Sequence, residues 1–118
     1  MAEHNLLGKK GEEIAQKHLI SQGYKVISIN WMFNHKEIDI IAKEGEVLVF
    51  VEVKTRTENF WGNPEEFVSK KKQKLLISAA ESYINEINFV GESRFDIISI
   101  LLTKEETHIE HIKEAFYP

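Results

Sequence analysis

The chain contains no cysteine, only two prolines, and only two aspartates beside seventeen glutamates. The absence of cysteine excludes disulfide bonds, thiolate metal sites and a cysteine nucleophile, and it suits the cytoplasm. No apolar run approaches the ~20 residues that span a bilayer. The first residues also lack the basic and apolar stretches of a signal peptide. We therefore expect a cytoplasmic protein with no membrane partner.

Length and composition predict a single globular domain over residues 1–118. Of the 118 residues, 42% are hydrophobic and 29% are charged, which is an ordinary globular balance. The formal net charge is −4 and the sequence pI is about 5.7. This balance argues against a protein that coats nucleic acid by bulk electrostatics. It is compatible with an enzyme whose carboxylates bind a metal ion and whose basic residues are confined to one part of the surface.

The hydrophobic pattern predicts an α/β fold with the element order αβββαββ, a mixed sheet flanked by helices. A helix is expected over about 5–22, and its small residues Gly8, Gly11 and Ala15 would let its backbone approach a sheet closely. A second helix begins either after Asn63 or after Ser69 and runs to about residue 87. Strands are expected at 24–29, 37–42, 46–54 and 94–102, with a short edge strand at 107–112.

The two aspartates, Asp39 and Asp96, both lie inside apolar strand-like runs. Aspartate is depleted from strands because its short side chain competes for backbone hydrogen bonds. A strand that keeps one at this cost usually has a reason. For Asp96 we favour a structural reason, either a pairing with Arg94 or a cap at the start of the strand.

The spacing around Asp39 predicts a site. A two-residue turn at Glu44-Gly45 would set Asp39 opposite Phe50, and Glu52 opposite Glu37. Asp39 and Glu52 would then be diagonal neighbours on one face, ~7–8 Å apart at the backbone. Their carboxylates repel each other in a partly apolar setting unless a cation lies between them.

An oxygen-only pair of this kind suits Mg²⁺ or Mn²⁺. The strand expected over 46–54 alternates, and its two faces comprise Val47, Val49, Val51 and Val53 on one side and Leu48, Phe50, Glu52 and Lys54 on the other. Lys54 therefore shares a face with Glu52 and could hold an attacking water or a phosphate oxygen. Glu12 of the first helix could supply a further ligand, or it could simply be solvated. The apolar stripe of the second helix is formed by Val68, Leu75, Leu76, Ala79 and Tyr83. Lys72 falls within this stripe, so it would either pair with these carboxylates or extend to water.

The spacing of Asp39 from the triplet Glu52-Val53-Lys54 resembles the PD-(D/E)XK nuclease signature, with Ile38 in place of its proline. Nearly the whole chain resembles the YraN-like family of small bacterial proteins. The matching residues are Gly8, Gly11-Glu12, Ala15, Gly23-Tyr24, Asn30, Glu37-Ile38-Asp39-Ile40-Ile41, Phe50-Val51-Glu52-Val53-Lys54-Thr55-Arg56, Gly62, Val68, Lys72, Ala80, Arg94-Phe95-Asp96 and Ala115-Phe116.

The resemblance implies a restriction-endonuclease-like fold related to archaeal Holliday-junction resolvases, with nucleic acid as the substrate class. It also implies that Asp39 and Glu52 bind divalent metal and that Lys54 assists the water. The supporting glutamate of the helix would be Glu12.

Four residues are candidates for contacts with nucleic acid: Arg56, Trp61, Lys71 and Lys72. The lysine run 70–74 could grip phosphates, although such a run is usually a solvated helix face. Phe60 and Trp61 could stack on bases or pack over the sheet edge. The five histidines show no metal-ligand spacing, and we expect His108 and His111 at the surface.

We therefore expect a Mg²⁺- or Mn²⁺-dependent endonuclease that acts on DNA. Two other hypotheses keep the same fold: a non-catalytic nucleic-acid-binding module, and a protein-interaction subunit. The complete acid-acid-lysine set favours the enzyme. The sequence leaves open whether the chain forms a homodimer.

Overall fold

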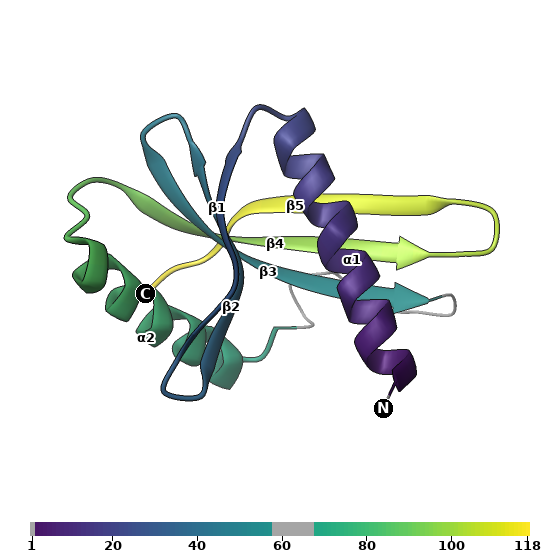
Figure 1. Ribbon diagram of the computed structural model, residues 1–118, viewed down its shortest axis with the longest axis horizontal. Coiled ribbons are helices and arrows are strands. Elements are labelled where there is room, and N and C mark those ends of the chain that lie inside the picture. The colour runs from purple at the N-terminus through teal and green to yellow at the C-terminus, as the bar shows by residue number, and fades with distance from the viewer. Residues whose placement is uncertain (1, 58–67) are drawn as a thin grey trace.

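The computed structural model describes residues 2–57 and 68–118, and of residues 2–5 only the backbone. The order of helices and strands in this part of the chain confirms the predicted αβββαββ arrangement (Figure 1). The elements are α1 (Ala2–Ser21), β1 (Lys25–Phe33), β2 (Lys36–Glu44), β3 (Val47–Thr57), α2 (Lys70–Ile87), β4 (Ser93–Leu102) and β5 (Thr107–Phe116).

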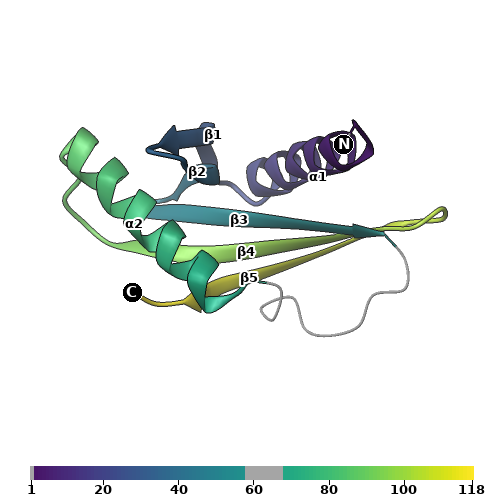
Figure 2. The same ribbon diagram turned by 90° about the horizontal axis from the view of Figure 1, so that it is seen from below.

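The five strands form one mixed sheet in the order β1-β2-β3-β4-β5. Neighbouring strands are antiparallel except β3 and β4, which are parallel. A parallel pair needs a crossover connection, and α2 lies in that connection. β5 is an edge strand, as predicted, although it runs to Phe116 and is not short. Figure 2 shows α1 on one side of the plane of β3, β4 and β5.

The alternation of β3 places a helix on each face of the sheet. Val49 and Val51 pack in one apolar cluster with Ala15 and Leu19 of α1. Leu48 and Phe50 face the other way, into a cluster with four α2 residues: Leu76, Ala79, Ala80 and Tyr83. The predicted apolar faces of β3 are therefore confirmed, and β3 is buried between the two helices.

The end of β3 differs from the sequence prediction, and one of the two predicted starts of α2 is confirmed. β3 continues to Thr57, where a loop was expected from Thr55, because its parallel ladder with β4 runs on to the pair Thr57↔Leu102. α2 begins at Lys70, and the hydroxyl of Ser69 caps it by accepting from Lys72 N–H. The alternative start at Asn63, like Phe60 and Trp61, lies outside the described residues. Leu75, placed in the apolar stripe of α2 from the sequence, is 43% exposed.

The predicted register of the β2–β3 hairpin is wrong by two residues. The turn is formed by Gly45 and Glu46, and the pairs Glu44↔Val47 and Ile40↔Val51 follow from it. Gly45 has φ +60°, and glycine at the first central position of a two-residue turn accepts such a value without steric cost. A shift of two residues leaves every side chain on its predicted face. Continuing this register places Asp39 directly opposite Glu52 and not diagonal to it.

Gly11 allows the close approach of α1 to β3. A Cβ atom at Gly11 would lie 1.8 Å from Thr55 Oγ1 and 2.9 Å from Thr55 Cβ, so the whole threonine side chain would have to move. We expect Gly11→Ala to lower the free energy of unfolding by ~1–3 kcal/mol, the usual effect of overpacking. Denaturant unfolding of the variant checks this value.

Gly8 provides the matched control, because nothing lies within 4 Å of a Cβ built there. Gly8→Ala should therefore stabilise the protein by up to ~1 kcal/mol through helix propensity alone. Thr55→Gly should rescue Gly11→Ala if the clash is the cause. Equal unfolding energies for the two alanine variants would contradict the close contact.

Candidate metal centre

The β1–β2 hairpin diverges from β3 beyond Ile40. The β2–β3 ladder ends at the pair Ile40↔Val51, although β2 begins at Lys36 and β3 continues to Thr57. Figure 1 shows the hairpin crossing β3 at a steep angle. At the point of divergence, Asp39 Oδ2 accepts a hydrogen bond of 2.9 Å from Val53 N–H. A side chain thus satisfies a strand donor that faces β2. We define the opening as the point beyond Ile40 and Val51 where the paired strands β2 and β3 separate.

Three carboxylates converge at this opening. Glu12 of α1 and Glu37 and Asp39 of β2 each offer an oxygen atom, and these atoms lie within 4.8 Å of one another. Asn30 Nδ2 donates to Glu12 Oε1 at 3.2 Å and so orients it. Glu37 was not among the residues predicted for the site. Its position two residues before Asp39 in a strand was the available signal, since such residues share a face.

Glu52 and Lys54 lie on the β3 side of the opening. The side chain of Glu52 is 5% exposed, and its Oε2 lies 3.8 Å from Lys72 Nζ. Its other oxygen, Oε1, is buried and has no hydrogen-bond partner within the described ranges. Lys54 is half-buried and lowers the pKa of Glu52 through its charge. The predicted contact of Lys72 with the carboxylates is confirmed.

Burial is the main cause that raises the pKa of three carboxyl groups here, those of Glu12, Asp39 and Glu52. Burial is the largest cause for Asp39, whose pKa rises to about 8, and the charge of Glu52 adds to it despite the Val53 N–H bond. Burial also raises the pKa of Glu52, against the opposing charge of Lys72. For Glu12, burial outweighs the hydrogen bond from Asn30. The cluster therefore carries more acidic groups than can ionise together at neutral pH without added positive charge.

These residues fit a hard divalent cation such as Mg²⁺ or Mn²⁺. All the donors are carboxylate oxygens, which these ions prefer. The unpartnered Glu52 Oε1 is the sharpest sign, because a buried polar atom without a partner is costly. A cation between Asp39 and Glu52 would satisfy that atom and relieve the repulsion.

The raised pKa of Asp39 predicts how stability depends on pH when no divalent metal is present. From about pH 4 to about pH 8, the unfolded chain has released a proton that the folded chain retains. The free energy of unfolding should therefore fall as pH rises through this range and level off above it. Denaturant unfolding in a chelating buffer measures the slope, and Asp39→Asn should reduce it. An unfolding energy that increased with pH across this range would contradict the assignment.

The family model described as "Uncharacterised protein family UPF0102" matches residues 11–100. The chain belongs to the UPF0102 family. It is 46% identical over 117 residues to a UPF0102 protein of Christiangramia forsetii, covering 99% of this chain and 98% of that one. A UPF0102 protein of Flavobacterium johnsoniae is 46% identical over 121 residues, with the same coverage. One from Porphyromonas gingivalis is 44% identical over 118 residues and covers 98% of this chain and 87% of its own.

The residues that match the UPF0102 model include every residue of the candidate metal centre, from Glu12 in α1 to Lys72 in α2. The expected likeness to YraN-like bacterial proteins is thereby confirmed. The family description and the names of these relatives state no activity, so any activity must be argued from the site itself.

The remaining residues predicted for nucleic-acid contacts differ in position. Lys71 of this UPF0102 protein is exposed on the first turn of α2, and Lys72 reaches Glu52. Arg56 is half-buried near the end of β3, where its Nη1 donates to Thr55 O at 3.2 Å. Trp61 lies outside the described residues. Over the described residues, the chain has no helix long and apolar enough to cross a membrane.

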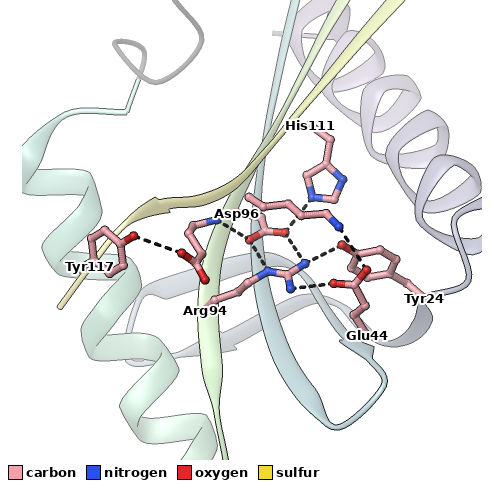
Figure 3. A network of polar contacts seen from close by, with 8 residues as sticks. Tyr24, Glu44, Arg94, Asp96, His111 and Tyr117 are labelled. Atoms are coloured by element: carbon pink, nitrogen blue, oxygen red, sulfur yellow. Dashed lines mark hydrogen bonds and ion pairs between the residues drawn. The ribbon is translucent and has the colours of Figure 1, made fainter.

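Asp96 belongs to a separate polar network in the UPF0102 chain (Figure 3). It is fully buried and accepts hydrogen bonds from Arg94 Nε at 2.9 Å and from Glu114 N–H at 3.2 Å. The structural pairing predicted with Arg94 is confirmed. His108 is 58% exposed, as expected, but the surface assignment of His111 is wrong. The His111 side chain is only 9% exposed, and its Nε2 lies 2.7 Å from Asp96 Oδ2.

Proposed function

We propose that this UPF0102 protein is a divalent-metal-dependent endonuclease of the PD-(D/E)XK type that hydrolyses phosphodiester bonds in DNA. One observation carries the proposal: the carboxylates of Glu12, Glu37 and Asp39 converge, and Asp39 interacts with the buried Glu52 of β3, which has an unpartnered oxygen. We further propose the restriction-endonuclease-like kinship that its sequence implies, and action as a single domain in the cytoplasm.

Asp39 and Glu52 would hold the Mg²⁺ or Mn²⁺ ion, with Glu12 and Glu37 completing the acidic side of the site. When bound, the ion supplies positive charge to the scissile phosphate and favours ionisation of the attacking water. The protein does the rest through positioning. Val53 N–H holds the Asp39 carboxylate in place, and Asn30 holds that of Glu12.

Lys54 is the residue suited to orient the nucleophile. It stands two residues after Glu52 in β3, so the two side chains share a face. Its ammonium group can donate hydrogen bonds to a water or to a phosphate oxygen as charge develops there. Lys72 approaches Glu52 from α2 at 3.8 Å and favours its ionised form.

The first turn of α2 supports nucleic acid as the substrate class. It contains lysines and no acidic residue, and Ser69 caps it. A helix N-terminus attracts phosphate through its free N–H groups and its dipole. Lys72 of this turn contacts Glu52. A phosphate bound by Lys70 or Lys71 would therefore lie near the carboxylates, on the side that faces α2.

The test is cleavage by the purified chain with Mn²⁺ or Mg²⁺ on a panel of linear, flapped and branched DNA. Lys54→Gln should lower the cleavage rate at least ~100-fold, as loss of a group that stabilises developing charge does, while metal binding is retained. Lys74→Gln is the matched control, because Lys74 is exposed on α2, and it should retain activity.

Two outcomes would overturn the proposal. Cleavage that persists equally in Lys54→Gln and in Asp39→Asn would belong to a contaminant. Salt-sensitive DNA binding without cleavage in either metal would identify a non-catalytic binding module in place of the enzyme.

A further inference from the structure

A cavity of about 470 Å³ opens between the C-terminal end of α1 and β5. It is lined by His18, Gln22, Tyr24, Glu44, His111 and Lys113. It is separate from the carboxylate cluster. Glu44 is the last residue of β2, five residues beyond Asp39, which corresponds to ~16 Å along a strand. None of its lining residues belongs to the proposed nuclease site.

The charged groups behind the cavity are already paired with one another (Figure 3). Arg94 donates to Asp96, to Glu44 and to the hydroxyl of Tyr24. Lys113 donates to the second oxygen of Glu44 at 3.2 Å. Arg94 can be buried because these partners balance its charge. The carboxylates of Glu44 and Asp96 are already used in these contacts. Among the described residues, the imidazole rings of His18 and His111 each keep at least one nitrogen outside this network.

His111 is oriented as a metal-binding histidine would be. Its Nε2 lies 2.7 Å from Asp96 Oδ2, and a carboxylate acceptor requires the ring proton on that nitrogen. The lone pair is then on Nδ1, which Figure 3 shows on the opposite side of the ring from Asp96. Histidine ligands typically donate their other N–H to a carboxylate in this way, which fixes the tautomer and the ring direction.

His18 of α1 lies against the same ring. The centroids of His18 and His111 are 5.6 Å apart, and their planes make an angle of 71°. Two imidazoles that bind one ion at 2.0–2.1 Å have centroids ~5–5.5 Å apart. The observed spacing therefore needs little change. In the described part of the chain, neither ring nitrogen of His18 takes part in a hydrogen bond.

We propose that His18 and His111 form a second metal site, specific for a borderline transition metal ion such as Zn²⁺. Nitrogen donors favour Zn²⁺, Ni²⁺ and Cu²⁺ over Mg²⁺ and Mn²⁺, so this site and the carboxylate site select different ions. The cavity is also lined by Gln22, whose amide oxygen can complete the coordination together with water. Asp96 is the positioning residue, because it holds the His111 ring without touching the ion.

The experiment is a Zn²⁺ titration of the full chain in competition with a chromophoric chelator, with excess Mg²⁺ present to occupy the carboxylate site. We expect one Zn²⁺ per chain and at least ~10-fold weaker binding in His18→Gln. A Co²⁺ titration should show visible absorption bands that His18→Gln removes. His108→Gln is the matched control, since His108 is on the same strand as His111 but 58% exposed, and it should leave Zn²⁺ affinity unchanged.

His111→Gln removes the second ligand, but it also removes a partner of Asp96, so His18→Gln is the decisive variant. Asp39→Asn separates this site from the proposed nuclease and should leave Zn²⁺ affinity unchanged. Zn²⁺ affinity that is equal in the parent chain and in His18→Gln would overturn the proposal. So would Zn²⁺ binding that is lost in Asp39→Asn.

Discussion

Asp39→Asn is expected to abolish metal-dependent DNA cleavage and to weaken Mg²⁺ or Mn²⁺ binding by at least ~100-fold. Even the outer partners of a metal cost 10–100-fold when they are removed, and Asp39 is proposed as a direct ligand. The amide oxygen can still accept from Val53 N–H, so the fold should persist. Calorimetric titration with Mn²⁺ and a cleavage assay measure the two effects.

The same variant should be more stable than the parent chain at alkaline pH when no divalent metal is present. The pKa of Asp39 rises to about 8 mainly because the group is buried, and next because Glu52 is negative. An amide removes both costs. Glu46→Gln is the control, because Glu46 is an exposed residue of the β2–β3 turn and should change neither binding nor stability. A destabilised Asp39→Asn that still cleaved DNA would refute the assignment.

Asp96→Ala is expected to cost ~3–5 kcal/mol of unfolding free energy, the usual result of removing one partner from a buried ion pair. The truncation leaves Arg94, which is 14% exposed, without its buried partner, and it leaves His111 without its acceptor. Denaturant unfolding measures the loss. The control is Glu106→Ala, which breaks the exposed pair between Glu106 and His108 and should cost ~0–1 kcal/mol.

The Asp96 network also predicts an acid limit to stability. Burial alone would raise the pKa of Asp96, but the hydrogen bonds from His111, Arg94 and Glu114 N–H together hold it below its usual value. The unfolded chain therefore takes up a proton first as pH falls below about 4, and stability is lost through the folded pKa. If Asp96→Asn lost as much stability on acidification as the parent chain, another group would be responsible.

The fold was largely predictable because the strands alternate cleanly. Val49 and Val51 were assigned to one face and Leu48 and Phe50 to the other, and each pair lies where that period places it. The hairpin register was not predictable from turn preference alone, since Gly45 can occupy either central position of a two-residue turn. Because the predicted register was wrong by two residues, an even number, Asp39 and Glu52 still lie on the same face of the hairpin.

The candidate site was only partly predictable. Glu12, Asp39, Glu52 and Lys72 were named from sequence, but Glu37 was missed, although its spacing of two residues from Asp39 places both on one strand face. Its role depends on where the hairpin separates from β3, which is a tertiary feature. The burial of His111 likewise depends on Asp96, a residue of the neighbouring strand, and no spacing within β5 indicates it.

The hydrogen bond from Val53 N–H to Asp39 makes this carboxylate a spacer as well as a proposed ligand. An aliphatic residue at position 39 would leave that N–H free to donate to a main-chain oxygen of β2. The hydrogen-bonded ladder between β2 and β3 could then extend beyond the pair Ile40↔Val51. The two strands would then pair where they now diverge. A descendant of this protein that lost Asp39 to such a residue would lose this divergence together with the proposed ligand, whereas one that acquired asparagine would keep the divergence and lose only the carboxylate.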